Sequence, residues 1–183
     1  MKPKGTKKLE TDRLILRRFV IEDAENMYNN WASDSEVVKY LTWPVHSDIG
    51  VTKALLADWI TEYQNDNYYM WVIEYKESKK AVGNISVVRF NEAVESADIG
   101  YCLSRALWGH GIMTEALKAV IDFLFDEVEL NRVSACHDAD NPKSGRVMLK
   151  AGMKPEGVLR QAGKNNQGIC DEVWYSVIKS DRV

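Results

Sequence analysis

The chain has 183 residues, of which 45% are hydrophobic and 28% are charged, and its formal net charge is −3. This composition is ordinary for a single folded domain in water and excludes a disordered chain. The small negative charge excludes a general attraction to nucleic acid or to an anionic membrane, and no apolar run is long enough for a membrane span or a signal peptide. We expect one domain over residues 1–183, with residues 1–8 as a flexible, locally basic tail.

Cysteine and histidine are few and scattered, without the spacing of a zinc site or a disulfide framework. We therefore predict no metal, no disulfide and a reducing, cytoplasmic location. The residues concerned are Cys102, Cys136, Cys170, His46, His110 and His137.

The first part of the chain predicts a strand followed by helices. Residues 11–19 alternate in polarity as a strand does, whereas residues 22–32 and 48–64 place their apolar side chains at helical spacing. A short helix is expected over residues 34–41, and Pro44 ends it because proline cannot continue a helix.

The middle of the chain predicts three antiparallel strands and then a long helix. The strands are expected over residues 68–75, 81–90 and 97–103, with a charged turn at 76–80 between the first two. From Ile112 the apolar positions return to helical spacing.

The last part predicts a strand, a helix and a hairpin. Asn141 is expected to cap the helix, because a side-chain oxygen at that position can accept from free amides and proline suits the first helical position. The expected elements are a strand over residues 132–137, a helix from Pro142 to Gly152, and a hairpin that pairs 153–162 with 169–179 across a loop at 163–168.

The turn Trp108-Gly109-His110-Gly111 stands between a strand and a helix start. Free N–H groups there point together at the positive end of a helix dipole, and glycine lets a ligand approach the backbone, so the turn predicts an anion site. A Walker loop is excluded because Gly111 is followed by Ile112 and Met113, and a dinucleotide fingerprint is excluded because Thr114 stands where its third glycine belongs.

The same stretch resembles the acetyl-CoA pyrophosphate loop of the GCN5-related N-acetyltransferases, in the branch that contains the ribosomal-protein N-terminal acetyltransferases. Met113 departs from the general pattern, which has Gly or Ala there. Two further segments carry the resemblance, L-E-T-D-R-L-I-L-R-R-F near the start and N-P-K-S-G-R-V-M-L-K-A-G-M-K-P-E-G near the end.

This resemblance implies a mixed α+β fold with flanking helices and a mostly antiparallel sheet, whose fourth and fifth strands run parallel and splay apart. It implies acetyl-CoA as cosubstrate, with its pantetheine arm in the gap. The residues expected to bind it are Tyr101, Cys102, Leu103, Trp108, Gly109, His110, Gly111, Ile112, Met113, Thr114, Asn141 and Ser144.

Catalytic groups are less well marked in the sequence. By the resemblance, Ser144 protonates the leaving thiolate, although a serine in a first helical turn also commonly satisfies a backbone amide. Cys102 as an acyl-carrying nucleophile is a rival, weakened by the lack of a nearby histidine, and a backbone N–H around Cys102 or Leu103 is expected to stabilise the oxyanion.

The general base has no clear candidate. Some relatives carry a carboxylate where this chain has Gly163, which leaves Asp98, Asp171 and Glu172, each of which could equally be an ordinary surface or pairing residue. An α-amine with a pKa near ~8 is easier to deprotonate than a lysine near ~10.4, which favours protein N-termini as acceptors.

Three functions stay open on these grounds. The first is acetyl transfer to a primary amine by direct attack in a ternary complex, with the N-terminal amine of a ribosomal protein as acceptor. The second is the same reaction on a small amine such as a polyamine or an aminoglycoside. The third is a CoA-binding module without turnover. No nucleic acid or membrane partner is expected, and a homodimer is compatible with the sequence.

Overall fold

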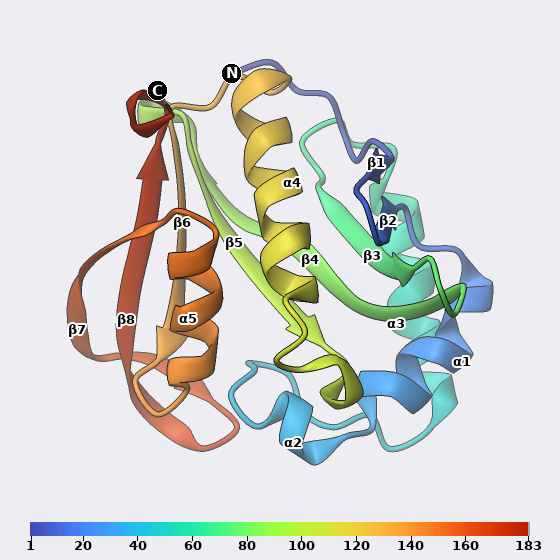
Figure 1. The fold of residues 1–183 in the computed structure, drawn as a ribbon. Helices are drawn as coiled ribbons and strands as arrows, with labels where there is room; N and C mark the ends of the chain where they lie inside the picture. Colours follow the sequence, from blue (N-terminus) through green and yellow to red (C-terminus); the bar gives the residue numbers. More distant parts are fainter. Residues whose placement is uncertain (183) are drawn as a thin grey trace.

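An eight-stranded sheet organises the computed structural model, which describes residues 1–182 (Figure 1). The strands lie in the order β1-β2-β3-β4-β5-β6-β8-β7, and only β5 and β6 run parallel. This confirms the expected mixed fold and sheet. The strands are β1 (Leu9–Glu10), β2 (Leu14–Arg17), β3 (Met70–Tyr75), β4 (Lys80–Asn91), β5 (Ser96–Leu103), β6 (Arg132–Asp138), β7 (Lys154–Asn165) and β8 (Gly168–Ile178).

Helices cover both faces of the sheet. In Figure 1, α4 and α5 lie in front of it, and α1 and α3 lie on the opposite side. The predicted helix at 22–32 ends in a π-helical turn at Tyr28–Ala32. The α-helices are α1 (Ala24–Met27), α2 (Ser35–Val38), α3 (Ile49–Glu62), α4 (Ile112–Asp126) and α5 (Pro142–Lys150).

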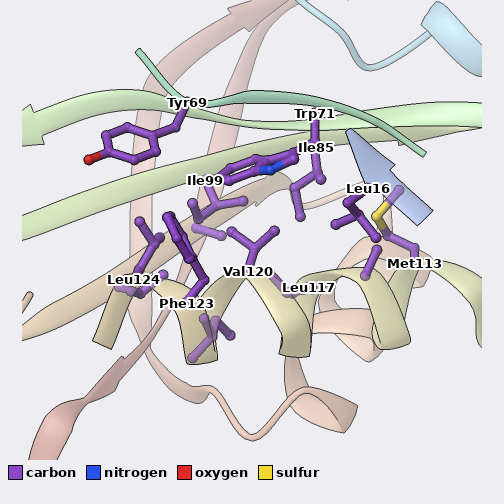
Figure 2. Packing of buried hydrophobic residues seen from close by; sticks show 14 of the residues in the cluster. Leu16, Tyr69, Trp71, Ile85, Ile99, Met113, Leu117, Val120, Phe123 and Leu124 are labelled. Atoms are coloured by element: carbon purple, nitrogen blue, oxygen red, sulfur yellow. The ribbon is translucent and has the colours of Figure 1, made fainter. Parts of the chain in front are cut away.

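The main core lies between α4 and the sheet. Figure 2 shows Val120 and Phe123 of α4 directed at Trp71 and Ile99 of the strands. The rings of Trp71 and Phe123 meet edge to face with centroids 5.8 Å apart, an arrangement that adds to the stabilisation from burial. The helical spacing of the apolar residues of α4 thus reflects a buried stripe.

A second core cluster fills the opposite face. Phe19, Met27, Trp31 and Leu56 pack there against the far side of β3 and β4. Because the two clusters use alternate residues of the same strands, the central strands are buried on both faces.

Residues 1–8 are ordered, contrary to the flexible tail expected from their charge. Thr6 donates to the carbonyl of Tyr68 and accepts from the N–H of Met70, at 3.0 Å in each case. The indole of Trp71 donates to the carbonyl of Lys7 at 2.6 Å. The lysines remain at the surface while the backbone between them is hydrogen-bonded, a pattern that composition alone does not reveal.

The β7–β8 hairpin is longer than expected. The predicted loop at 163–168 is mostly strand, since Gly163 pairs with Cys170 and Asn165 pairs with Gly168. Its polar residues are typical of a loop, but here they form backbone pairs between β7 and β8 at the exposed edge of the sheet.

Within the described residues, no helix combines the length and apolar character needed to cross a membrane.

We predict that Phe123→Ala lowers the free energy of unfolding by about 3–5 kcal/mol, because it leaves a cavity beneath Trp71. Urea denaturation would measure it. Val158→Ala is the control, since Val158 is 55% exposed and should change stability by less than about 0.5 kcal/mol. Equal effects of the two substitutions would contradict this description of the core.

Candidate functional site

The site is built around the separation of β5 and β6. These strands pair only where Ser96–Asp98 faces Arg132–Ser134. Beyond that point β5 stays paired with β4 and β6 with β8, so the two strands diverge and leave a gap (Figure 1). At the vertex, the Ser134 hydroxyl donates to Asp98 Oδ1 at 2.6 Å.

Backbone N–H groups of β5 line this gap. The N–H of Ser104 donates to the carbonyl of Val82, and Cys102 lies opposite Asn84 in the same antiparallel ladder. Since N–H groups alternate in direction along a strand, those of Tyr101 and Leu103 point away from β4 into the gap. They are the candidate oxyanion donors, whereas the N–H of Cys102 faces β4.

The Cys102 side chain also points away from the gap. Its thiol lies in the second core cluster and donates to Asn84 Oδ1 at 2.9 Å. Burial raises the thiol pKa to about 12, and a nucleophilic cysteine needs its thiolate. This geometry argues against both roles expected for Cys102, because strand register rather than sequence position decides which face it occupies.

The glycine turn has the backbone conformation that an anion site needs. Gly109 and Gly111 have φ angles of 82° and 76°, and a Cβ at Gly109 would find nothing within 4 Å. Within residues 1–182, the N–H groups of 109–113 have no protein partner. They stand at the start of the 15-residue helix α4, where the dipole favours negative charge.

The side chains after the turn point away from the anion site. Ile112 and Met113 are buried in the main core, where Figure 2 shows Met113 beside Leu16 and Leu117. The Met113 side chain therefore takes up no space in the loop. This explains how the chain can have Met where the family pattern has Gly or Ala.

Hydrogen bonds of Glu115 connect the start of α4, just after the turn, to residues near the start of the chain. Glu115 accepts from the hydroxyl of Thr11 at 2.5 Å and from the backbone N and Nε of Arg13 at 2.9 and 2.7 Å. Arg13 also donates to the carbonyl of His110 at 3.0 Å. Burial opposes ionisation of Glu115, but these hydrogen bonds outweigh it and its pKa is lowered. The sequence reasoning missed this anchor, although its members lie in two of the segments that carry the resemblance.

Trp108 and α5 enclose the turn from the other side. The Trp108 indole donates to the carbonyl of Leu103 at 2.8 Å, and the ammonium of Lys143 lies 5.3 Å from its ring centroid. Lys143 thereby places a positive charge near the predicted anion site, a contribution that the sequence did not mark.

Ser144 faces β5 across the gap. Its hydroxyl lies 2.9 Å from the hydroxyl of Tyr101, which also donates to the carbonyl of Ser144 at 3.1 Å. Burial raises the pKa of Tyr101, so the phenol stays protonated. Helix α5 itself has no tyrosine; this one comes from the neighbouring strand.

Asn141 stands before α5 but does not cap it with its side chain. Its backbone carbonyl accepts from the N–H of Ser144 at 3.1 Å, and no side-chain capping bond is formed. The expected cap is therefore wrong, because the φ and ψ angles of −112° and 60° differ from the extended conformation usual at a cap. The Asn141 amide is left available for a ligand.

Asp98 is committed to partners at the vertex. Besides Ser134, it accepts from Arg89 Nε at 2.6 Å. Both carboxylate oxygens of Asp98 are therefore already hydrogen-bonded, and this geometry weakens the catalytic role expected for Asp98.

The sheet face opposite α4 and α5 is hollowed beside the vertex. Arg89, Asp98, Ser134 and Trp174 are among the residues that line this open hollow. It lies over the paired ends of β5 and β6 and reaches the vertex of the gap at Asp98 and Ser134.

The wide end of the gap is closed by the tip of the β7–β8 hairpin. Asn166 Nδ2 donates to the carbonyls of Val38 and Trp43 at 2.8 and 2.7 Å, and its N–H donates to the carbonyl of Leu41 at 3.2 Å. We call these three bonds the Asn166 clasp. The backbone of Trp43 thus lies against the tip of the hairpin.

Comparison with known proteins identifies the family. Residues 13–154 match the model described as "Acetyltransferase (GNAT) domain". The chain belongs to this family. It is an acetyl-CoA-dependent N-acetyltransferase, an acyltransferase of the GNAT fold.

Similar proteins support this assignment. An N-acetyltransferase of Bacillus subtilis, named uncharacterized YoaA, is 32% identical over 93% of this chain and 96% of its own length. The Escherichia coli ribosomal-protein-serine acetyltransferase is 33% identical over 75% and 76%. The crystal structure of the microcin C7 self immunity acetyltransferase MccE, in complex with acetyl-CoA and AMP, superposes with a TM-score of 0.82 at 27% identity, covering 92% of this chain and 93% of MccE.

The residues present fit acetyl-CoA. The unpartnered N–H groups of 109–113 suit its diphosphate, and the gap between β5 and β6 suits its pantetheine arm. When bound, acetyl-CoA supplies an acetyl group activated as a thioester. Within residues 1–182 there is no cluster of three or more side chains able to hold a metal ion.

We predict that Gly111→Val weakens acetyl-CoA binding about tenfold. A β-branched residue at positive φ costs roughly 1–2 kcal/mol, and relief of that strain displaces the N–H groups that hold the diphosphate. Calorimetry would measure the affinity. Gly168→Val is the control, since Gly168 also has positive φ, 113°, but is the first residue of β8, beside the hairpin turn. Equal affinity in wild type and Gly111→Val would count against the loop assignment.

Proposed function

We propose that the acyl acceptor is the α-amine of a protein N-terminus, that of a ribosomal protein. The open hollow beside the vertex carries this proposal. It is lined by residues of both halves of the sheet, among them Arg89, Asp98 and Trp174, and an open trough accommodates the end of a polypeptide better than an enclosed pocket does. The similarity to the ribosomal-protein-serine acetyltransferase supports the same acceptor class.

The chemistry of the amine supports this choice. Deprotonation of an α-amine with a pKa near ~8 costs about 1 kcal/mol at neutral pH, whereas a lysine near ~10.4 costs roughly 4–5 kcal/mol. An α-amine therefore makes the smaller demand on the enzyme's proton acceptor.

The proposed reaction is direct attack with both substrates bound. The gap would hold the thioester near its vertex, and the amine would approach from the hollow, so that proximity supplies much of the rate. The N–H groups of Tyr101 and Leu103 point to the gap and would stabilise the oxyanion. Ser144, paired with Tyr101, would return a proton to the thiolate.

Acetylation of a small amine is the second candidate. Asp138, Asp140 and Asp171 lie near the end of β6 and the start of β8, and a cluster of acidic residues there favours a compact cation. The neighbour MccE is described in complex with acetyl-CoA and AMP, so a related fold holds a small second ligand.

We also propose a cytoplasmic location. Cys102, Cys136 and Cys170 are all free thiols, as is usual in a reducing compartment.

We predict that purified protein acetylates peptides with free N-terminal serine or alanine at a higher kcat/KM than it acetylates spermidine. Release of the CoA thiol would measure both rates, with N-terminally blocked peptides as the control. A preference for spermidine would support the small-amine candidate, and equal rates with blocked and free peptides would contradict N-terminal acetylation.

We predict that Ser144→Ala lowers kcat about 10- to 100-fold and leaves the affinity for acetyl-CoA nearly unchanged, because the hydroxyl is needed when the thiolate leaves. Tyr101→Phe should have a smaller effect of the same kind. Ser78→Ala, at an exposed turn, is the control. An unaltered kcat in Ser144→Ala would leave this serine a helix-start residue.

A further inference from the structure

An amine acetyltransferase must accept a proton, because its acceptor is an ammonium ion at neutral pH. Carboxylates near the gap are the available groups, and most already have partners. Asp98 is held by Arg89 and Ser134. Asp138 accepts from Asn165 Nδ2 at 2.5 Å, and Asp171 accepts from the N–H of Gln161 at 2.8 Å.

In the part of the chain that the structure describes, Asp140 also lacks a side-chain partner but is exposed beyond the end of β6, which leaves Glu172 as the half-buried exception. It lies on β8 opposite Asp138, is half-buried, and accepts a hydrogen bond from the Trp174 indole at 3.0 Å. Among residues 1–182 it forms no ion pair, unlike Asp98. A carboxylate without a cationic partner is free to pair with an incoming ammonium group.

Gly163 leaves the space that the Glu172 carboxylate occupies. A Cβ at Gly163 would lie 2.6 Å from Glu172 Oε1 and 2.9 Å from its Cγ. The pairing of β7 with β8 is irregular between Leu159 and Gly163. Any larger residue at this position would displace the carboxylate.

The neighbours of Glu172 place it on the acceptor side of the gap. Cys136 lies in the part of β6 that has separated from β5, directly opposite Trp174. Burial, together with the negative charges of Glu172 and Asp98, raises the pKa of the Cys136 thiol to about 12. Both carboxylates therefore lie close to Cys136, and Trp174 also lines the open hollow.

We propose that Glu172 is a catalytic residue that takes the proton from the ammonium group of the acceptor, held in place by Trp174 and by the absence of a side chain at Gly163. The ammonium gives one proton to Glu172, and the neutral amine forms the N–C bond to the thioester carbonyl. The C–S bond then breaks and the sulfur leaves with the electron pair. Ser144 gives its hydroxyl proton to the thiolate and takes the second proton from the nitrogen in exchange. Glu172 releases its proton to water.

This inference rests on the acetyltransferase activity of the family and not on the identity of the acceptor. It can therefore be tested with either acceptor class, a peptide with N-terminal serine or spermidine. Hydrolysis of acetyl-CoA in the absence of an amine gives a further rate, because attacking water also loses a proton.

The first experiment compares Glu172→Gln with wild type. We expect kcat to fall about 100-fold, the range typical of general-base removal, with unchanged melting temperature and acetyl-CoA affinity. Glu127→Gln is the matched control, since Glu127 is exposed at the C-terminal end of α4, away from the gap; it should stay within about twofold of wild type.

The pH dependence separates catalysis from packing. In Glu172→Gln, kcat/KM should rise about tenfold per pH unit up to the amine's own pKa, because the unprotonated amine then comes from solution. A purely structural loss would not recover in this way. The charged and titratable groups near Glu172 are Cys136 and Asp138 on β6, Cys170 and Asp171 on β8, and Asp98 with Arg89.

The second experiment uses Gly163→Ala. Its methyl group must displace Glu172, so kcat should fall in the wild-type background and change little in Glu172→Gln, a non-additive pair. Additive effects, or an acetylation and hydrolysis rate in Glu172→Gln within twofold of wild type, would overturn the proposal. If only the peptide fails as acceptor, the N-terminal assignment fails and the role of Glu172 is still measured with spermidine and water.

Discussion

The site depends on the loss of backbone pairing between β5 and β6 beyond their vertex. A parallel pair would normally continue its ladder, and each buried backbone group left without a partner costs about 1–3 kcal/mol. The protein limits this cost by keeping β5 bonded to β4 and β6 bonded to β8. The remaining groups include the N–H groups of Tyr101 and Leu103, which we propose bind the reacting thioester. The interruption of the sheet thus frees backbone N–H groups of β5 that would otherwise pair with β6.

The diphosphate end of the site depends on a second constraint, the contact of Glu115 with Thr11 and Arg13. Two segments about a hundred residues apart in sequence meet there, and both are fixed by the buried face of α4. The turn with Gly109 and Gly111 is held by this contact on one side and by Trp108 and its neighbours on the other. A rigid turn presents its N–H groups without the entropy cost of ordering them on binding.

Sequence periodicity predicted much of this structure because most of its elements bury one regular face. The long helix and the strands of the central sheet follow from spacing, and the glycine turn follows from the lack of side chains where a ligand must approach. What could not be predicted depended on register or on distant contacts. Cys102 shows this, because its direction follows from pairing with β4. The Tyr101–Ser144 pair joins a strand and a helix more than forty residues apart, and no local pattern indicates it.

The polar residues of the β7–β8 hairpin illustrate the same limit, since Gly163 and Asn165 look like loop residues in the sequence but belong to a ladder. Likewise, the hydrogen bonds of the Thr6 hydroxyl and of the Lys7 carbonyl could not be predicted in a segment whose composition is that of a solvated tail. In both cases long-range pairing overrides local preference.

The Asn166 clasp connects the two diverging halves of the sheet at the wide end of the gap. The halves that part at Asp98 and Ser134 are joined again at the opposite end, so the width of the opening is set from both ends. Three hydrogen bonds together contribute on the order of 2–5 kcal/mol, which keeps an unclasped state rare but thermally reachable. Reactants and products therefore enter and leave the gap mainly from the two faces of the sheet. Passage through the wide end requires the tip of the β7–β8 hairpin to detach.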